Sequence, residues 1–134
     1  MAKPFGFSSK EHLKSRKGIE DLFANGAAFS VFPLRVIYKL VPAQPRIHVQ
    51  AGFTASKKHF KKAVDRNRIK RLLREAYRLQ KEVLLDEVKT KESTLLVFFI
   101  YTDRTLASFD TVMKAMERSL ELLRKKLEVH EGTA

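Results

Sequence analysis

The chain has 134 residues, a net charge of +12 and no cysteine. That length suits one domain with an adequate core, and the lack of cysteine excludes a disulfide framework and a cysteine-based zinc site. The beginning of the sequence has no apolar stretch like that of a signal peptide, and the longest apolar run, residues 95–101, is too short to cross a bilayer. The chain is therefore expected to be a soluble cytoplasmic protein with a polyanionic partner, nucleic acid first and an anionic membrane surface second.

The first half of the chain predicts one helix and two strands. Residues 1–10 contain a proline, a glycine and paired serines, and are expected to form a flexible leader. Residues 11–25 have helical apolar spacing that ends at an Asn-Gly pair. Residues 29–41 and 46–54 are rich in β-branched and aromatic side chains, and the short proline-containing link between them predicts an antiparallel hairpin.

The second half predicts a basic helix, a central strand and a final helix. The basic helix spans residues 61–87, and residues 94–102 form a nearly continuous apolar run of strand length. Asp103 is expected to cap the last helix, whose apolar residues recur at spacings of three and four. The order is α-β-β-α-β-α, so residues 11–130 predict one α+β domain built as a two-layer α/β sandwich.

The basic helix is expected to have two separate faces. At about 100° per residue, its apolar positions fall in one arc, and these are Ile69, Leu72, Leu73, Ala76 and Val83. A different arc holds polar, mostly cationic residues, namely Arg66, Asn67, Lys70, Arg71, Arg74 and Arg78. Like charges four residues apart repel by roughly a few tenths of a kcal/mol per pair. A phosphate backbone would offset that repulsion, so we expect the cationic face to bind RNA.

No residue pattern assigns catalysis or metal binding to the chain itself. The four histidines, His12, His48, His59 and His130, lack metal-ligand spacing. The sequence has neither a paired-carboxylate pattern nor a glycine-rich phosphate loop. We therefore expect no catalytic residue, no metal site and no cofactor bound by the protein alone.

Three segments carry a family resemblance. These are SKK at 56–58, AV at 63–64 and RNRIKRLLRE at 66–75. Together they resemble the signature of the bacterial ribonuclease P protein subunit. The segment HLKSRKGIEDLFANG at 12–26 is similar to the first helix of the same family. Two departures stand out: the stretch before RNR is one residue longer and lacks the family's frequent glycine, and Ile19 stands where an aromatic residue is common.

The resemblance implies a ribonucleoprotein that removes the 5′ leader of precursor transfer RNA, with the catalytic centre and its Mg²⁺ ions in a catalytic RNA subunit. It implies RNA contacts by the basic helix and the residues before it, which here are Lys57, Lys58, Arg66, Asn67, Arg68, Lys70, Arg71, Arg74 and, from the helical face above, Arg78. A cleft for the leader would use Ile19, Phe23 and Tyr38. The family fold has a left-handed βαβ crossover like that of the second domain of ribosomal protein S5. The protein is expected to be monomeric without RNA.

Two other functions stay open at the level of sequence. One is a ribosomal or general RNA-binding protein without an enzymatic assembly. The other is a protein that lies on a membrane surface, which the Arg-rich helix and the scarcity of exposed apolar anchors disfavour.

Overall fold

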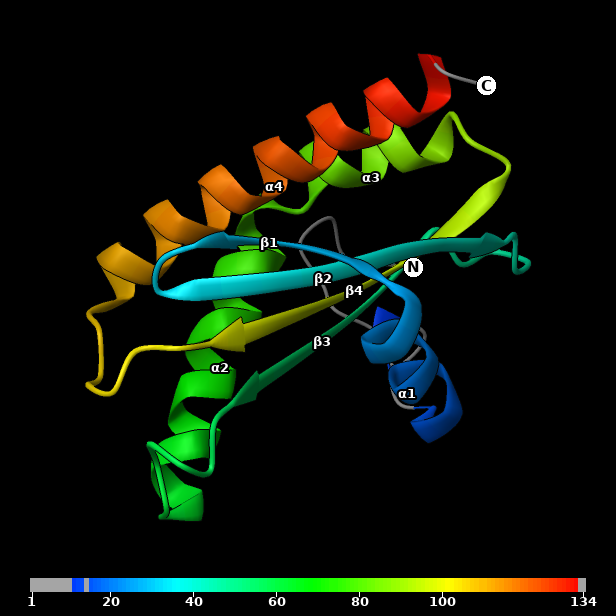
Figure 1. Cartoon of the computed structure of the whole chain (residues 1–134). Coiled ribbons are helices and arrows are strands. Elements are labelled where there is room, and N and C mark those ends of the chain that lie inside the picture. The colour runs from blue at the N-terminus through cyan, green and yellow to red at the C-terminus, as the bar shows by residue number, and fades with distance from the viewer. Residues whose placement is uncertain (1–10, 14, 133–134) are drawn as a thin grey trace.

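A computed structural model describes residues 11–13 and 15–132, with side chains as far as Glu128. The expected leader, residues 1–10, lies outside the described residues. The elements run in the order α1 (Arg16–Asn25), β1 (Ala27–Val31), β2 (Leu34–Pro42), β3 (Val49–Ala55), α2 (Ala63–Gln80), α3 (Glu82–Lys89), β4 (Ser93–Tyr101) and α4 (Phe109–Gly132) (Figure 1). The α+β class is confirmed, with one strand and one helix more than expected.

The sheet differs from the predicted hairpin. The predicted strand 29–41 is two strands, because Pro33 has no backbone N–H to donate and lies in the turn that pairs β1 with β2. The antiparallel hairpin predicted between residues 29–41 and 46–54 is wrong. β2 and β3 do not pair with each other; both pair with β4, β2 in the antiparallel and β3 in the parallel direction. The sheet order is β1-β2-β4-β3. β4 takes this inner position because its side chains are buried on both faces.

The parallel pair β3 and β4 is joined through α2 and α3, which makes a βαβ unit. In Figure 1 both strands point the same way, β4 lies above β3, and α2 lies behind the sheet. A chain that leaves β3, passes behind the sheet and returns in β4 turns in the left-handed sense. The crossover therefore has the rare hand that the resemblance implies, against a strong general preference for the right-handed one.

The ends of the helices correct three expectations. The first helix begins at Arg16 rather than residue 11, with the Ser15 hydroxyl accepting the Gly18 N–H at 3.1 Å. The basic helix is not continuous over 61–87, since Lys81 separates α2 from α3. Asp103 does not cap the final helix. Its carboxylate binds the backbone N–H of Arg104 in the preceding turn, and the Ser108 hydroxyl accepts the N–H of Thr111 instead.

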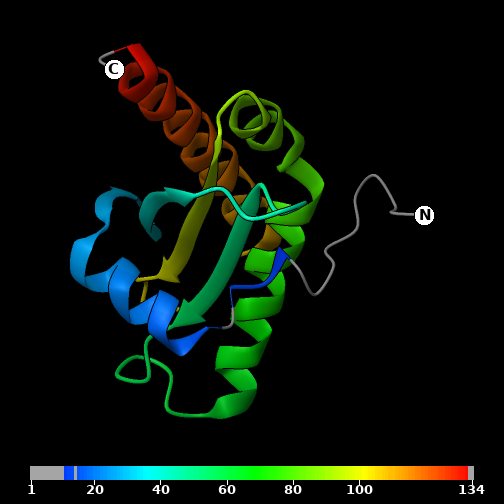
Figure 2. The same cartoon turned by 90° about the vertical axis from the view of Figure 1, so that its right-hand side faces the viewer.

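Two apolar clusters hold the layers together. The larger lies between the sheet and α2–α4, and includes Leu34, Val36, Phe99, Leu73 and Met116. The smaller lies on the opposite face, where α1 packs Leu22 against Ile37, Leu96 and Phe98. The sheet and α2–α4 are thus the two main layers, and α1 covers part of the second sheet face, as Figure 2 shows with α1 and α2 on opposite sides of β3.

Within the described residues, no helix combines the length and the apolar character that crossing a membrane requires.

Candidate nucleic-acid interface

The outer face of α2 carries the predicted cationic row. Asn67, Arg68, Arg71 and Arg74 are exposed and Lys70 is half-buried. The opposite face is buried in the core through Ile69, Leu73 and Ala76. The two-faced helix is therefore confirmed from residue 63 to residue 80. Val83 is an exception: it was predicted to face inward but is 51% exposed, because the helix breaks at Lys81 and the angular phase restarts in α3.

The cations of α2 fall into two groups by their partners. Among the described residues, no carboxylate forms an ion pair with Arg68, Lys70, Arg71 or Arg74. By contrast, Arg78 forms an ion pair and hydrogen bonds with Glu75, and this guanidinium holds the pKa of the Glu75 carboxyl below its usual range. The unpaired cations therefore lie in the part of the helix that contains the RNR motif.

Lys81, just beyond the end of α2, is also neutralised within the molecule. Its ammonium group lies 2.6 Å from a carboxylate oxygen of Glu11, and its side chain is almost wholly buried. The pair ties the start of the described chain to the junction of α2 and α3. Lys81 is thus a structural cation, unlike the exposed ones earlier in the helix.

Arg66 has a structural partner that the sequence did not reveal. Its guanidinium donates to the backbone carbonyl oxygens of Phe60 at 2.7 Å and Lys61 at 2.8 Å. Phe60 is buried and packs against Tyr101, with ring centroids 6.0 Å apart. The longer, glycine-free stretch before the RNR motif is therefore held to α2 by the first arginine of that motif.

The loop that precedes α2 adds further positive charge. Lys57 and Lys58 are exposed there, and the Ser56 hydroxyl accepts the backbone N–H of Lys58 at 3.1 Å. Lys58 and His59 line an open recess of about 370 Å³ together with Arg104 from the turn after β4. Sequence reasoning missed Arg104, because a basic residue 46 positions beyond Lys58 carries no local signal that it lies nearby.

A cleft separates α1 from α2 across β3, with a volume of about 230 Å³. We call it the α1–α2 cleft. It is lined by Ile19, Ala51, Gly52, Phe98, Lys70 and Arg74, together with His12, Leu13 and Phe53. Predicted residues from two different elements therefore meet here, since Ile19 comes from α1 and the two cations come from α2. The cleft has an apolar floor and one cationic wall.

Gly52 and Phe98 shape the floor of the cleft. A Cβ atom on Gly52 would lie 2.5 Å from a ring carbon of Phe98, so only glycine allows that ring to lie against β3. Phe23 contacts the same ring edge-to-face at 5.3 Å between centroids and is 48% exposed. The predicted residue Phe23 thus lies beside the cleft rather than within it. An isolated glycine inside a strand was the available signal for this close approach.

The structure does not bring Tyr38 to the cleft. Tyr38 lies on the opposite face of the sheet, where it packs against the larger cluster and contacts Phe29 at 6.0 Å between ring centroids. Burial there raises the pKa of its hydroxyl. Strand alternation indicates this placement, since Tyr38 shares its face with Leu34 and Val36, whereas Ile37 faces α1.

Chemically, this surface can hold a single-stranded polyanion. The apolar floor offers rings and aliphatic groups to bases, and the cations of α2 offer donors to phosphates. Over the described part of the chain, no three histidine, aspartate or glutamate side chains gather where they could hold a metal ion.

The comparisons with known proteins agree on one family. Residues 7–125 match the model of the family described as Ribonuclease P. The ribonuclease P protein component of Porphyromonas gingivalis is 40% identical over 116 residues, which cover 87% of this chain and 85% of that protein. The corresponding protein of Chlorobium phaeobacteroides is 31% identical over 124 residues, which cover 85% of each chain.

Solved structures share the fold. The RNase P protein of Staphylococcus aureus aligns with a TM-score of 0.66 and 18% identity, covering 84% of this chain and 94% of that one. The RNase P protein of Thermotoga maritima aligns with a TM-score of 0.63 and 22% identity, covering 86% of this chain and 96% of that one. At these identities the structural likeness establishes the fold, while the sequence relatives establish the family.

Proposed function

Because the chain belongs to the ribonuclease P protein family, we propose that it binds two RNAs through two adjoining surfaces. RNA binding and transfer-RNA processing follow from the family, as does a place in an endoribonuclease. In our proposal the exposed row Asn67, Arg68 and Arg71, with the loop lysines Lys57 and Lys58, contacts the catalytic RNA subunit. The α1–α2 cleft holds the 5′ leader of precursor transfer RNA.

One observation supports this division most strongly: Lys70 and Arg74 line the same cleft as the apolar residues Ile19 and Phe98. A single-stranded leader presents phosphates on one side and unstacked bases on the other. A groove that combines cations with apolar or aromatic side chains suits both, and each stacked base contributes about 1–3 kcal/mol in comparable proteins. The cations of α2 therefore serve both surfaces, with Lys70 and Arg74 directed to the leader.

The chemistry itself is proposed to lie in the catalytic RNA, with Mg²⁺ bound through that RNA. The protein would contribute by neutralising phosphates where the catalytic RNA and the leader approach one another. Such neutralisation lowers the concentration of Mg²⁺ that two RNAs need in order to associate, because fewer counterions must be held between them. We place this assembly in the cytoplasm, with a protein that is monomeric without RNA.

The test compares two precursor transfer RNAs in the presence of the cognate catalytic RNA at low Mg²⁺, one with a long 5′ leader and one with no leader. The wild-type protein should stimulate removal of the long leader. It should also increase the affinity for the RNA that carries the leader more than the affinity for the RNA without one. Arg74→Ala should reduce that preference, whereas Arg71→Ala should weaken binding of the two RNAs alike.

Tyr38→Phe is the matched control, since Tyr38 lies on the other face of the sheet and should leave the preference unchanged. Absence of stimulation by the wild-type protein would contradict the proposal. If the protein then bound unrelated structured RNAs equally well, a general RNA-binding role would be the better description.

A further inference from the structure

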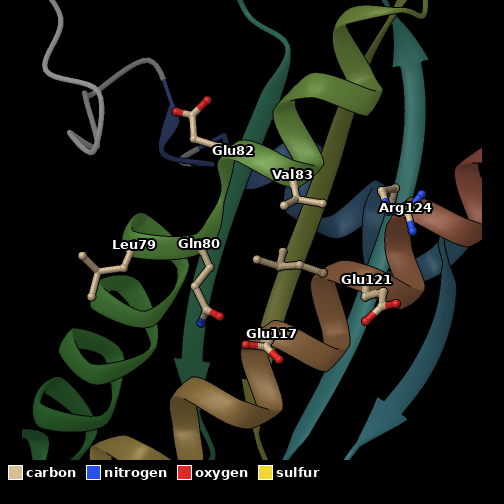
Figure 3. A pocket seen from close by; sticks show the side chains of 8 residues that line it. Leu79, Gln80, Glu82, Val83, Glu117, Glu121 and Arg124 are labelled. Atoms are coloured by element: carbon tan, nitrogen blue, oxygen red, sulfur yellow. The ribbon is translucent and has the colours of Figure 1, made fainter.

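A second groove lies between the end of α2, the start of α3 and α4 (Figure 3). We call it the α2–α4 groove. Its volume is about 510 Å³. Its apolar surface comes from Leu79, Val83 and Leu120, and Leu79 and Val83 are 39% and 51% exposed. Two large apolar side chains at one opening leave apolar surface for an occupant to cover.

The rim of the groove is acidic in an otherwise basic molecule. Three glutamates line the groove, Glu82, Glu117 and Glu121, together with one cation, Arg124, which pairs with Glu128 at 2.6 Å (Figure 3). Glu121 pairs with the exposed Lys125 at 3.7 Å. In the described part of the chain, neither Glu82 nor Glu117 forms an ion pair. An occupant of this groove should therefore be apolar and positively charged, which excludes nucleic acid.

Residues 1–10, MAKPFGFSSK, have that chemistry. They contain two phenylalanines, Phe5 and Phe7, and two lysines, Lys3 and Lys10, with no acidic residue. They also start from the correct place. Glu11, the next residue, is held by Lys81, and Lys81 lies in the chain between two groove residues, Gln80 and Glu82.

The length of the segment sets how far its two rings can reach. Phe7 is four residues from Glu11 and Phe5 is six, so an extended chain carries them at most about 14 Å and 22 Å from it. The side chain of Lys81 points to Glu11, and its sequence neighbours face the groove around the same helix junction. Leu79 and Val83 are each two residues from Lys81 in the sequence, so the rings have to reach only the helix junction at which Glu11 is held.

We propose that residues 1–10 dock in the α2–α4 groove of their own chain, with Phe5 and Phe7 against Leu79 and Val83 and the lysines near the glutamate rim. The docked segment covers the exposed apolar side chains and keeps its cations away from the α1–α2 cleft. The Glu11–Lys81 ion pair is the fixed point from which it starts.

The test uses the absence of cysteine, which lets Ala2→Cys place one spin label in the full-length protein. Paramagnetic broadening of backbone amide signals is measured against the reduced label. We expect loss of the Val83, Glu117 and Glu121 signals at every protein concentration. Adding Phe5→Ser and Phe7→Ser should restore them, whereas Phe32→Ser, at a remote residue that is 73% exposed, should not.

A second pair of variants examines the charges. Glu117→Gln combined with Glu121→Gln should weaken the broadening of Val83, and Glu92→Gln, at an exposed residue outside the groove, should leave it unchanged. Broadening of Ile19 and Lys70 instead would place the segment in the cleft and overturn the proposal. Broadening that grows with protein concentration would make a second copy the donor, and unbroadened groove signals would mean that no docking occurs; either result overturns it.

Discussion

The two halves of α2 carry the same kinds of residue for different purposes. In the first half, Arg68, Lys70 and Arg71 extend from the surface with no carboxylate partner in the described structure. At the other end, Arg78 is paired with Glu75, and Lys81 just beyond the helix is paired with Glu11. Within α2, the basic residues before Glu75, as far as Arg74, form no ion pair with a carboxylate among the described residues, so the cations that can bind phosphate lie in that part of the helix.

This difference shows that partners, rather than the number of basic residues, distinguish a binding surface from a structural one. A cation already held by a carboxylate must give up that partner before it can neutralise a phosphate, so it adds less to RNA affinity. Arg66 belongs to neither group. It has no ion pair among the described residues, but its guanidinium donates hydrogen bonds to carbonyl groups of the preceding loop. The predictions below separate the three kinds of cation.

The largest change in stability is expected for Lys81→Met. It leaves the Glu11 carboxylate partly buried without its ammonium partner, which should lower the free energy of unfolding by about 2–3 kcal/mol. Denaturant unfolding measures this loss, and the affinity for RNA should stay at the wild-type value. The double variant with Glu11→Gln should recover part of the loss. A stable Lys81→Met protein that binds RNA weakly would reverse the roles of the two halves.

Arg66→Ala should reduce both stability and RNA affinity. Removal of two charge-assisted hydrogen bonds to the loop carbonyls should lower the free energy of unfolding by about 1–2 kcal/mol. Arg66→Lys separates the effects, since lysine keeps the charge but its shorter side chain brings no donor to the place of Nη1, the atom that donates both bonds. We expect Arg66→Lys to lose stability while it keeps most of its affinity for RNA, as measured by unfolding and by filter binding. Full stability of both variants would remove the structural role.

Arg71→Ala should leave the fold unchanged and weaken binding to the catalytic RNA roughly tenfold, or about 1.4 kcal/mol. The side chain is exposed and has no ion pair among the described residues, so its removal takes away no ion pair that stabilises the folded protein. Titration with labelled RNA checks the affinity and circular dichroism checks the fold. A loss of helical signal at room temperature would instead make Arg71 structural.

The smallest effect is expected at Glu75, and it depends on pH. Because Arg78 lowers the pKa of this carboxyl in the folded protein, the pair contributes stability above the ordinary glutamate pKa and loses it as the pH falls through the lowered value. Glu75→Gln should therefore lower the stability slightly at neutral and alkaline pH, where the pair is intact, and change nothing well below the lowered pKa, so that the acid side of the stability curve becomes flatter. An equal change on both sides would mean that the pair does not act through this titration.

Local patterns predicted much of the fold and part of the site. The faces of α2 follow from helical periodicity as far as Gln80, but the break at Lys81 has no proline or glycine to announce it, and Val83 was therefore misplaced. Strand pairing depends on contacts between distant segments, so β4 between β2 and β3 was not foreseen.

The cleft shows the same division between local and distant information. Ile19 was expected there from the resemblance, and strand alternation alone would have placed Tyr38 on the other face. Phe98 lies 46 residues from Gly52 in the sequence, so its ring on the cleft floor could be found only once β3 and β4 were seen side by side. The single interior glycine of β3 was the one local sign of that contact.

The most direct measurement compares Arg74→Ala with Arg78→Ala in the salt dependence of binding to leader-bearing precursor transfer RNA. Arg74 is exposed in the cleft wall, whereas Arg78 is held by Glu75. Each phosphate contact to a single strand contributes about 0.7 to the slope of log K against log salt concentration. We predict that Arg74→Ala lowers the slope by about that amount and that Arg78→Ala leaves it unchanged. Equal slopes for the two variants would contradict the division of α2 into free and structural cations.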